Sequence, residues 1–455
     1  MQFICDLHIH SKYSRATSKE TDIENLNKWA RIKGVNVLAT GDFTHPLWLR
    51  ELKETLEPAE NGLYKFKSQK SRQVSEQAPI KSQNGFVLNG NHNHQPETRF
   101  MLTSEISSIY SKNGKTRKVH NLIFAPSFEV VEKINTHLGW IGNLKSDGRP
   151  ILGLDSKELA KIVLNISSEC MIVPAHAWTP WFSVFGYFSG FDSLEECFED
   201  YTKYIYAIET GLSSDPEMNW RWSKLDSLAL ISNSDAHSPA KIGREVNIFE
   251  GEEISYALIK EAIKKASPKA LAENNDNSAK LRMTKTIEFF PEEGKYHWDG
   301  HRNCGICLDP EESKKYNNLC PRCGKPLTIG VLNRVYRLSD RKKGEKPEKT
   351  IPFERMIPLE EIIADVLGIG TGTKGAQIHY KNLIKLFNSE FNVLLNVKKE
   401  DIASATMPEI AEGIERVRQG KVFISPGCDG DFGKISVFGK EEGRPKTRGG
   451  QETLF

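Results

Sequence analysis

Short apolar runs alternate with helix-like segments over residues 1–285 of the chain. Candidate helices lie between several of the runs, for example at 24–33 and 156–165. A helix that connects two strands favours parallel pairing, so this alternation predicts an α/β fold built on a parallel sheet or barrel. The predicted strands cover residues 3–7, 35–40, 99–103, 121–125, 171–174, 204–208 and 228–232.

Two other stretches depart from this alternation. Residues 58–98 are polar and rich in Asn, Gln, Lys and Ser, which predicts an insertion loop rather than a further strand. Beyond residue 357 the pattern predicts two helices around a glycine-rich turn at 368–375, then two strands around a turn at 426–433. The glycine-rich turn is either a plain helical hairpin or a contact for a nucleic-acid phosphate at the start of the second helix.

Composition and charge narrow the class of protein. The 455 residues carry a formal charge of +2 and exceed the size of one ordinary domain. No apolar run is long enough to span a bilayer, and the start "MQFICDLHIH" lacks a signal-peptide pattern, so we expect a cytoplasmic protein. Basic clusters at 65–72, 112–118, 339–349 and 443–450 are each explained as solvated loops, but together they favour a polyanionic partner.

Imidazoles and carboxylates recur where the predicted strands end. Successive side chains of a strand alternate between its faces, so His8 and His10 point the same way, as do Asp235 and His237. At the carboxyl ends of barrel strands such groups converge on one mouth. A lone histidine more often packs against other residues or caps a helix, and this would explain His45 or His94 taken alone. It does not explain the whole set of residues at the strand ends. It comprises His8, His10, Asp42, Glu105, His120, His176, Glu209, Asp235 and His237.

This ring of side chains suits divalent metals. Neutral imidazole and carboxylate bind Zn²⁺ well and also accept Mn²⁺ or Mg²⁺. Because the ring has too many ligands for one ion, it predicts two to three metals in one cleft. Such a cluster can supply a hydroxide and hold a phosphate, which is the chemistry of phosphoester hydrolysis.

The motifs "DLHIHSKYS", "TGDFTH", "TSEIS", "PAHAW" and "SNSDAH" resemble those of the polymerase and histidinol phosphatase (PHP) superfamily. The resemblance implies a distorted (β/α)7 barrel and a trinuclear metal site in which His8, His10, Glu105 and Asp235 are the catalytic residues and hold the first metal. Glu105 would bridge to a second metal on His120 and His176, and Asp42 and His237 would contribute to a third. Many members have a further histidine where this chain reads Ser14-Arg15-Ala16, so Arg15 is a candidate phosphate contact and His45 a candidate substitute ligand.

Eight cysteines are too few for a disulfide scaffold, but four follow the spacing C-x2-C-x12-C-x2-C. Two such knuckles provide a tetrahedral set of thiolates, so this spacing predicts one structural zinc. A redox pair would not need both halves. The remaining cysteines, Cys5, Cys170, Cys197 and Cys428, lie in or beside apolar stretches and are predicted to be core or loop residues. The predicted zinc ligands are Cys304, Cys307, Cys320 and Cys323.

These segments predict four parts: a PHP metal-dependent catalytic domain at 1–285, a four-cysteine zinc-binding domain at 286–345, a mainly helical region that contacts DNA at 346–440, and a flexible tail at 441–455. This order, with "ETGLSSDPEMNWRWS" and "SNSDAHSP", resembles the endonuclease Q family. The resemblance implies a DNA repair enzyme that recognises uracil, hypoxanthine and abasic sites, with xanthine as a further candidate. It would hydrolyse the phosphodiester 5′ to the lesion and leave a 3′-hydroxyl and a 5′-phosphate.

Aromatic side chains lie beside the predicted mouth, in "AWTPWFSVFGYF" and "NWRWS". A lesion read outside the base stack needs stacking surfaces, so these residues are candidates for contact with the base or the duplex. Packing of a long loop against the barrel would explain most of them equally well. The candidates are Trp178, Trp181, Phe182, Trp220 and Trp222.

The last residues, "QETLF", resemble the short peptide by which DNA-processing enzymes bind the replication sliding clamp, with Gln451, Leu454 and Phe455 as its anchors. An uninformative tail is the alternative.

For the whole chain, two alternatives to a lesion endonuclease stay open. One is a PHP-type phosphatase acting on a small phosphomonoester, and the other is a non-catalytic DNA- or clamp-binding protein with a degenerate barrel.

Overall fold

The computed structural model describes residues 1–67, 97–273 and 279–439. Most of the predicted insertion loop, including His94, lies outside these residues. So does the predicted tail with Gln451, Leu454 and Phe455. None of the helices in the described part of the chain is both long and apolar enough to cross a membrane.

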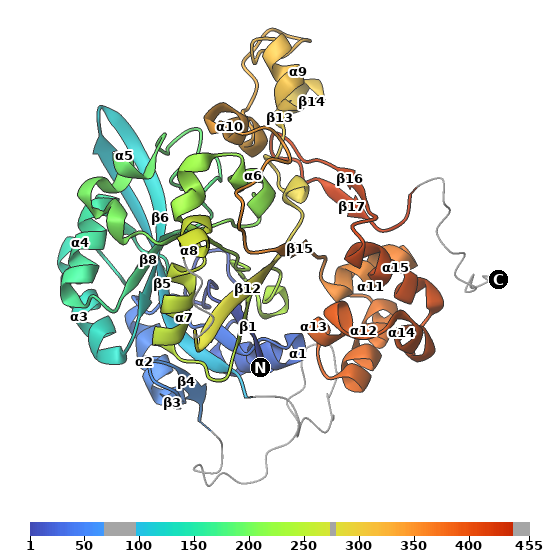
Figure 1. The fold of residues 1–455 in the computed structure, drawn as a ribbon, viewed down its shortest axis with the longest axis horizontal. Helices are drawn as coiled ribbons and strands as arrows, with labels where there is room; N and C mark the ends of the chain where they lie inside the picture. Colours follow the sequence, from blue (N-terminus) through green and yellow to red (C-terminus); the bar gives the residue numbers. More distant parts are fainter. Residues whose placement is uncertain (68–96, 274–278, 440–455) are drawn as a thin grey trace, which may run out of the picture.

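The part of the chain that was predicted to be catalytic, residues 1–285, is called the catalytic part below. It is built on an 11-stranded sheet, which β15 (Phe353–Arg355) from later in the chain completes, with a smaller two-stranded sheet beside it (Figure 1). Each of the seven predicted strands is present. They are β1 (Gln2–Asp6), β2 (Val37–Ala39), β5 (Arg99–Lys112), β6 (Lys115–Ala125), β8 (Met171–Pro174), β9 (Ala207–Glu209) and β10 (Ala229–Ile231).

The prediction of a parallel sheet is only partly right, because the sheet is mixed. β1–β2, β2–β5 and β9–β10 pair in parallel, whereas β5–β6, β6–β8 and β1–β11 are antiparallel. The cause lies in the link between β5 and β6, which is the dipeptide Asn113-Gly114 with both φ angles positive, at 54° and 72°. An Asn-Gly pair in this conformation closes a two-residue hairpin, so no helix intervenes.

Several strands were not predicted. β11 (Val246–Gly251) and β12 (Leu281–Glu288) extend the sheet beyond β1. Residues 289–352 follow, which are called the cysteine-containing segment below, and β15 then pairs with β12. The predicted loop at 58–98 begins with a strand, β4 (Tyr64–Phe66), which pairs with β5. Its apolar stretch is too short to show a period. The remaining short strands are β3 (Leu56–Pro58) and β7 (Ile151–Leu152).

Helices cover the sheet where the sequence predicted them. α1 (Ile23–Lys33) begins at Asp22, whose side chain accepts from the Asn25 N–H, and ends at Gly34 with φ 88°. α4 (Ser156–Ile166) begins at Asp155 in the same way. The other α-helices of this part are α2 (Pro46–Thr55), α3 (Phe128–Ile141), α5 (Leu194–Phe198), α6 (Pro216–Trp220), α7 (Tyr256–Lys264) and α8 (Pro268–Glu273).

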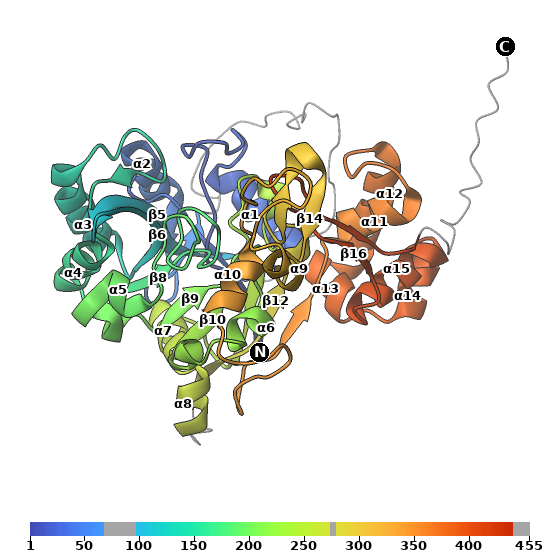
Figure 2. The same cartoon turned by 90° about the horizontal axis from the view of Figure 1, so that it is seen from above.

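The cysteine-containing segment projects from one edge of this body, and the C-terminal helices lie on one side of it (Figures 1 and 2). The predicted helices are α11 (Leu359–Leu367) and α12 (Lys374–Phe387), and the predicted strand pair is β16 (Phe423–Ser425) with β17 (Lys434–Ser436). The other elements here are β13 (Asp299–His301), β14 (Ile306–Leu308), α9 (Pro310–Lys315), α10 (Val331–Leu338), α13 (Glu390–Leu395), α14 (Lys399–Ala405) and α15 (Pro408–Arg418).

A buried ion pair joins the C-terminal helices to the catalytic part. Lys33 Nζ on α1 lies 2.7 Å from Glu390 Oε2 on α13, and both side chains are about 5% exposed or less. The same carboxylate accepts from the Tyr380 hydroxyl at 2.7 Å and from the Leu359 N–H at 3.1 Å. The pair therefore holds α1 and three C-terminal helices at one point.

We expect Lys33→Met to lower the free energy of unfolding by about 3–5 kcal/mol, because it leaves a buried carboxylate without its counter-charge. Thermal and urea unfolding followed by circular dichroism measure the change. Lys399→Met, which removes a half-exposed partner of Glu412, is the matched control and should leave the melting temperature almost unchanged. Equal shifts for the two variants would contradict a structural role for the buried pair.

Candidate functional site

The predicted ligands converge into two groups inside the catalytic part. His8, His10 and Asp235 form one group, and Glu105, His120 and His176 form the other. Within each group the ligand atoms lie within 4.8 Å of one another. His8 and His10 follow β1, Glu105 lies within β5, His120 lies in β6 opposite Ser107, and His176 follows β8. The antiparallel β5–β6 hairpin therefore supplies ligands from mid-strand rather than from strand ends.

Glu105 lies between the two groups. Its Oε1 is 2.7 Å from His120 Nδ1 and 3.0 Å from His176 Nε2. Its Oε2 is 3.3 Å from His10 Nε2. Each carboxylate oxygen thus faces a different group of imidazoles, which is the geometry of a bridging ligand.

The first group shows the orphaned atoms that a cation would satisfy. The Nε2 atoms of His8 and His10 and the Oδ1 of Asp235 are buried without a hydrogen-bond partner. Asp235 Oδ1 nevertheless lies only 3.6 Å from the first nitrogen and 3.1 Å from the second. Buried polar atoms that converge without bonding one another are rare in proteins, so the donor set fits a divalent metal.

The charged groups of the cluster shift one another's pKa values. Burial alone would raise the pKa of Glu105, but His120 and Arg149 hold that pKa well below its usual range. Burial would likewise lower the pKa of His8, but Glu209 and Asp235 raise it well above its usual value. The ring of acids and imidazoles therefore carries an ionised carboxylate at its centre.

The backbone around the ligands adopts an uncommon conformation. Asp42, His176 and Asp235 have positive φ angles of 51°, 30° and 46°. Such non-glycine residues cluster at functional sites, where surrounding contacts hold them in place. Gly211, with φ 62°, has no room for a side chain, because a Cβ there would lie 2.5 Å from the Cβ of His176.

Two carboxylates orient the histidines from behind. Glu209 is fully buried, lies 3.0 Å from His8 Nδ1, and accepts from the His176 N–H at 2.8 Å. Asp42 lies 3.0 Å from His10 Nδ1. Metal-ligating histidines commonly use their second ring nitrogen in this way, which fixes the tautomer and the ring orientation.

The third predicted metal set is not assembled among the described residues. The other oxygen of Asp42 accepts from the Ser11 N–H at 2.7 Å and from the Ser14 hydroxyl at 2.9 Å, so both of its oxygens are engaged. His237 packs its ring 4.6 Å from that of His10, and its Nδ1 faces the backbone oxygen of Asp235 at 2.8 Å. His45 stacks on Tyr13 with centroids 4.4 Å apart, a packing role.

The arginine nearest the cluster is Arg149, not Arg15. Arg15 extends into solvent with its side chain 78% exposed and contacts Asp147 at 3.2 Å. The guanidinium of Arg149 reaches Glu105 Oε2 at 3.1 Å. No sequence motif marks Arg149, because it lies in the loop 142–150, outside the predicted strand ends.

The five aromatic candidates divide into two groups. Trp178 and Trp222 are core residues, and the Trp178 indole donates to Asn219 at 2.7 Å. Trp220 packs against Phe353. Trp181 and Phe182 instead line a cavity of about 440 Å³, together with Lys295, Tyr296 and His297. Phe182 also contacts the group formed by Glu105, His120 and His176, with its ring 4.9 Å from that of His120.

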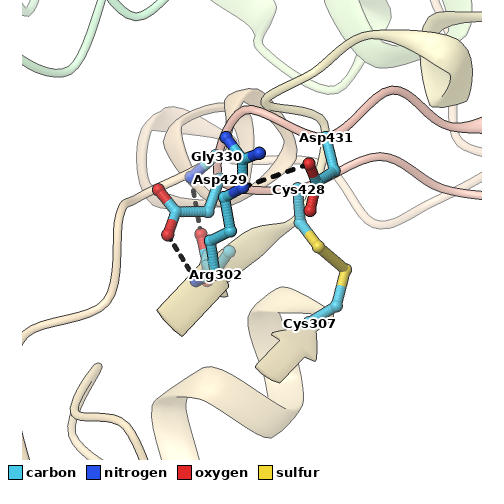
Figure 3. Close-up of a disulfide and its surroundings, with 7 residues drawn as sticks. Arg302, Cys307, Gly330, Cys428, Asp429 and Asp431 are labelled. Carbon is cyan, nitrogen blue, oxygen red and sulfur yellow. Dashed lines mark hydrogen bonds and ion pairs between the residues drawn. A yellow bond between two sulfur atoms is a disulfide. The ribbon is translucent and has the colours of Figure 1, made fainter. Parts of the chain in front are cut away.

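The cysteine cluster differs from the prediction in one ligand. Its members are Cys304, Cys320, Cys323 and His301, whereas Cys307 is bonded to Cys428 (Figure 3). The reason is strand pairing. Cys307 lies opposite Gly300 in the β13–β14 hairpin and His301 lies opposite Ile306, so Cys307 and His301 point to opposite faces. Three thiolates and one imidazole are a tetrahedral set that fits a structural zinc.

Two family models match parts of the chain. One, described as PHP-associated, matches residues 217–268, and the other, described as the MJ0043 C-terminal domain, matches residues 358–421. An uncharacterized protein of Methanocaldococcus jannaschii, MJ0043, is 37% identical over 268 residues. That match covers 57% of this chain but only 31% of MJ0043.

Two solved structures resemble nearly the whole chain. The lesion-specific endonuclease PfuEndoQ from Pyrococcus furiosus is 30% identical with a TM-score of 0.78, and the match covers 96% of this chain and 95% of that one. A structure of endonuclease Q, in complex with a 27-mer duplex that has an abasic lesion at the active site, is 30% identical. Its TM-score is 0.77, and the match covers 97% and 98% of the two chains.

We expect the cluster assignment to be visible in zinc content. Cys307→Ser should retain zinc, because Cys307 lies outside the cluster, whereas Cys304→Ser and His301→Ala should lose it. Elemental analysis of the purified variants after dialysis measures the stoichiometry. Zinc lost from Cys307→Ser and kept by His301→Ala would restore the assignment to four thiolates.

Proposed function

Because the chain belongs to the endonuclease Q family of nucleases, with an α/β fold of the PHP type, we propose that it is a DNA repair endonuclease. Its substrates are deaminated bases, uracil and hypoxanthine above all, and abasic sites in DNA. It hydrolyses the phosphodiester 5′ to the lesion. The similarity to a structure with an abasic lesion at its active site is the observation that carries the proposal.

The two ligand groups supply the catalytic centre of this proposal. His8, His10 and Asp235 would hold one divalent cation, His120 and His176 another, with Glu105 between them. When bound, such cations polarise a phosphoryl oxygen and lower the pKa of a coordinated water. Glu209 and Asp42 fix the two N-terminal histidines in the orientation that this binding needs.

Arg149 is the residue best placed to contact the scissile phosphate. Its guanidinium is about three-quarters buried beside Glu105. Bound metals would already balance the charge of Glu105, so the guanidinium would be available to a phosphate. A planar guanidinium matches the oxygens of a phosphate with two parallel hydrogen bonds. Arg149 therefore replaces Arg15 as the candidate phosphate contact.

The cavity beside Phe182 suits a base turned out of the duplex. Its aromatic walls, Trp181, Phe182 and Tyr296, offer stacking surfaces, and its volume of about 440 Å³ exceeds that of a single nucleobase. His297 also lines it, and burial lowers the pKa of His297 to about 4, so the ring is neutral at physiological pH. Its buried Nδ1 has no hydrogen-bond partner among the described residues.

Two further proposals rest on the sequence alone. The peptide Gln451-Glu452-Thr453-Leu454-Phe455 would tether the enzyme to a sliding clamp. The glycine-rich turn between α11 and α12 would contact a phosphate of the bound DNA. A function as a small-molecule phosphatase would leave the cysteine cluster and the C-terminal helices unexplained.

Cleavage of a defined lesion tests the proposal. We expect the metal-loaded protein to cut an end-labelled duplex once, directly 5′ to a deoxyuridine, deoxyinosine or abasic site. The undamaged duplex should stay intact. Asp235→Asn should abolish the cut, because it removes the charge opposite His8 and His10. Sequencing-gel mapping of the product ends is the measurement, and release of phosphate from small esters without a DNA cut would favour the phosphatase.

Arg149→Ala should lower kcat by about 100-fold or more, as removal of one preorganised donor to a developing charge does. Arg15→Ala is the matched control, since its side chain points into solvent, and should change kcat little. Metal content should be measured for both variants to separate phosphate contact from damage to the cluster. A larger loss for Arg15→Ala would return the phosphate contact to Arg15.

A further inference from the structure

The turn that joins β16 to β17 is fastened to the base of the cysteine-containing segment. The Gly427 N–H donates to the Glu292 oxygen at 2.8 Å, the Gly430 N–H to Lys295 at 3.0 Å, and the Gly433 N–H to Glu293 at 3.0 Å. Three backbone hydrogen bonds thus tie a seven-residue turn, 427–433, to residues 292–295.

Side chains fix the same turn from the other side (Figure 3). Cys428 is bonded to Cys307, Asp429 accepts from the Arg302 N–H at 2.6 Å, and Asp431 lies 3.3 Å from Arg302 Nε. A turn held by a covalent bond and by contacts at both ends has little freedom to move. Its shape is therefore set before any ligand arrives.

This rigid turn holds a phenylalanine out in solvent. Phe432 is 70% exposed, whereas phenylalanine is among the residues most often buried. Its one contact of note is Lys295, whose Nζ lies 4.4 Å from the ring centroid. An exposed apolar ring on a rigid turn, with the cation of Lys295 beside it, indicates a contact surface for another molecule.

Phe432 also contacts a residue of the cavity that is proposed to receive the base. Lys295 lines that cavity together with Tyr296 and Phe182, and the Phe182 ring packs against His120. Phe432 therefore contacts, in Lys295, a residue that lines the same cavity as Phe182.

We propose that Phe432 is a wedge that enters the DNA duplex at the lesion and fills the space that the extruded nucleotide leaves. The inference rests on the proposed function. A turned-out base leaves an apolar gap between neighbouring base pairs, and proteins commonly fill such gaps with aromatic or aliphatic side chains. Lys295 beside the ring is placed to contact a backbone phosphate of the same duplex.

The test compares one lesion in two contexts. A wedge matters only where a base must leave a stack, so Phe432→Ala should cut deoxyuridine in a duplex about ten-fold or more slowly, by the loss of one stacking contact. It should cut deoxyuridine in a single strand at the wild-type rate. Phe432→Trp should restore cleavage of the duplex. Phe423→Ala, which removes a half-exposed ring from β16 of the same hairpin, is the matched control and should leave both rates unchanged.

Base extrusion can be read without cleavage. In the Asp235→Asn background, 2-aminopurine placed beside the lesion should brighten when the protein binds, and Phe432→Ala should reduce that signal. Equal rates for wild type and Phe432→Ala on the duplex, or an equal loss on duplex and single strand, would overturn the wedge. Failure of the wild-type protein to cut any lesion would instead overturn the proposed function, and the fluorescence signal would then decide the wedge independently.

Discussion

The carboxylate of Glu105 is the group around which the catalytic part is arranged. It is buried within β5, with one oxygen toward His120 and His176 and the other toward His10 and Arg149. An isolated carboxylate in such a place would be too costly to keep ionised. The surrounding imidazoles and the guanidinium make the charge tolerable. Asp42 in turn orients the ring of His10, and Glu209 accepts from the His176 N–H.

The rest of the fold follows from the need to hold this arrangement rigid. The β5–β6 hairpin brings the side chains of Glu105 and His120 within 2.7 Å of one another. The loop after β8 places both His176 and the aromatic wall of the cavity. After the cysteine-containing segment the chain returns through β15 to the same sheet. This return connects the segment and the C-terminal turn that it holds to the sheet that carries Glu105, as the proposed cut at a set distance from a lesion would require.

Much of this was predictable from short-range patterns. The seven apolar runs became strands, the helices at 24–33 and 156–165 formed, and the six residues predicted for the first and second metals converged. The predictions that were wrong depended on how two strands pair and on which face of a strand a side chain occupies. Asn113-Gly114 turned an expected crossover into a hairpin, and strand alternation turned Cys307 away from the knuckle that its spacing suggested. Arg149 and His301 were missed because a lone arginine in a loop and a histidine outside a cysteine pair have no distinctive spacing.

The bridging role of Glu105 is the central claim, and electron paramagnetic resonance of the Mn²⁺-loaded protein tests it most directly. Two ions joined by one carboxylate are exchange-coupled, so the wild-type protein should give the multiline spectrum of a coupled pair. Glu105→Gln should give only isolated Mn²⁺ signals while keeping the fold. Isolated signals from the wild-type protein at full metal occupancy, or a coupled pair that survives Glu105→Gln, would contradict the account.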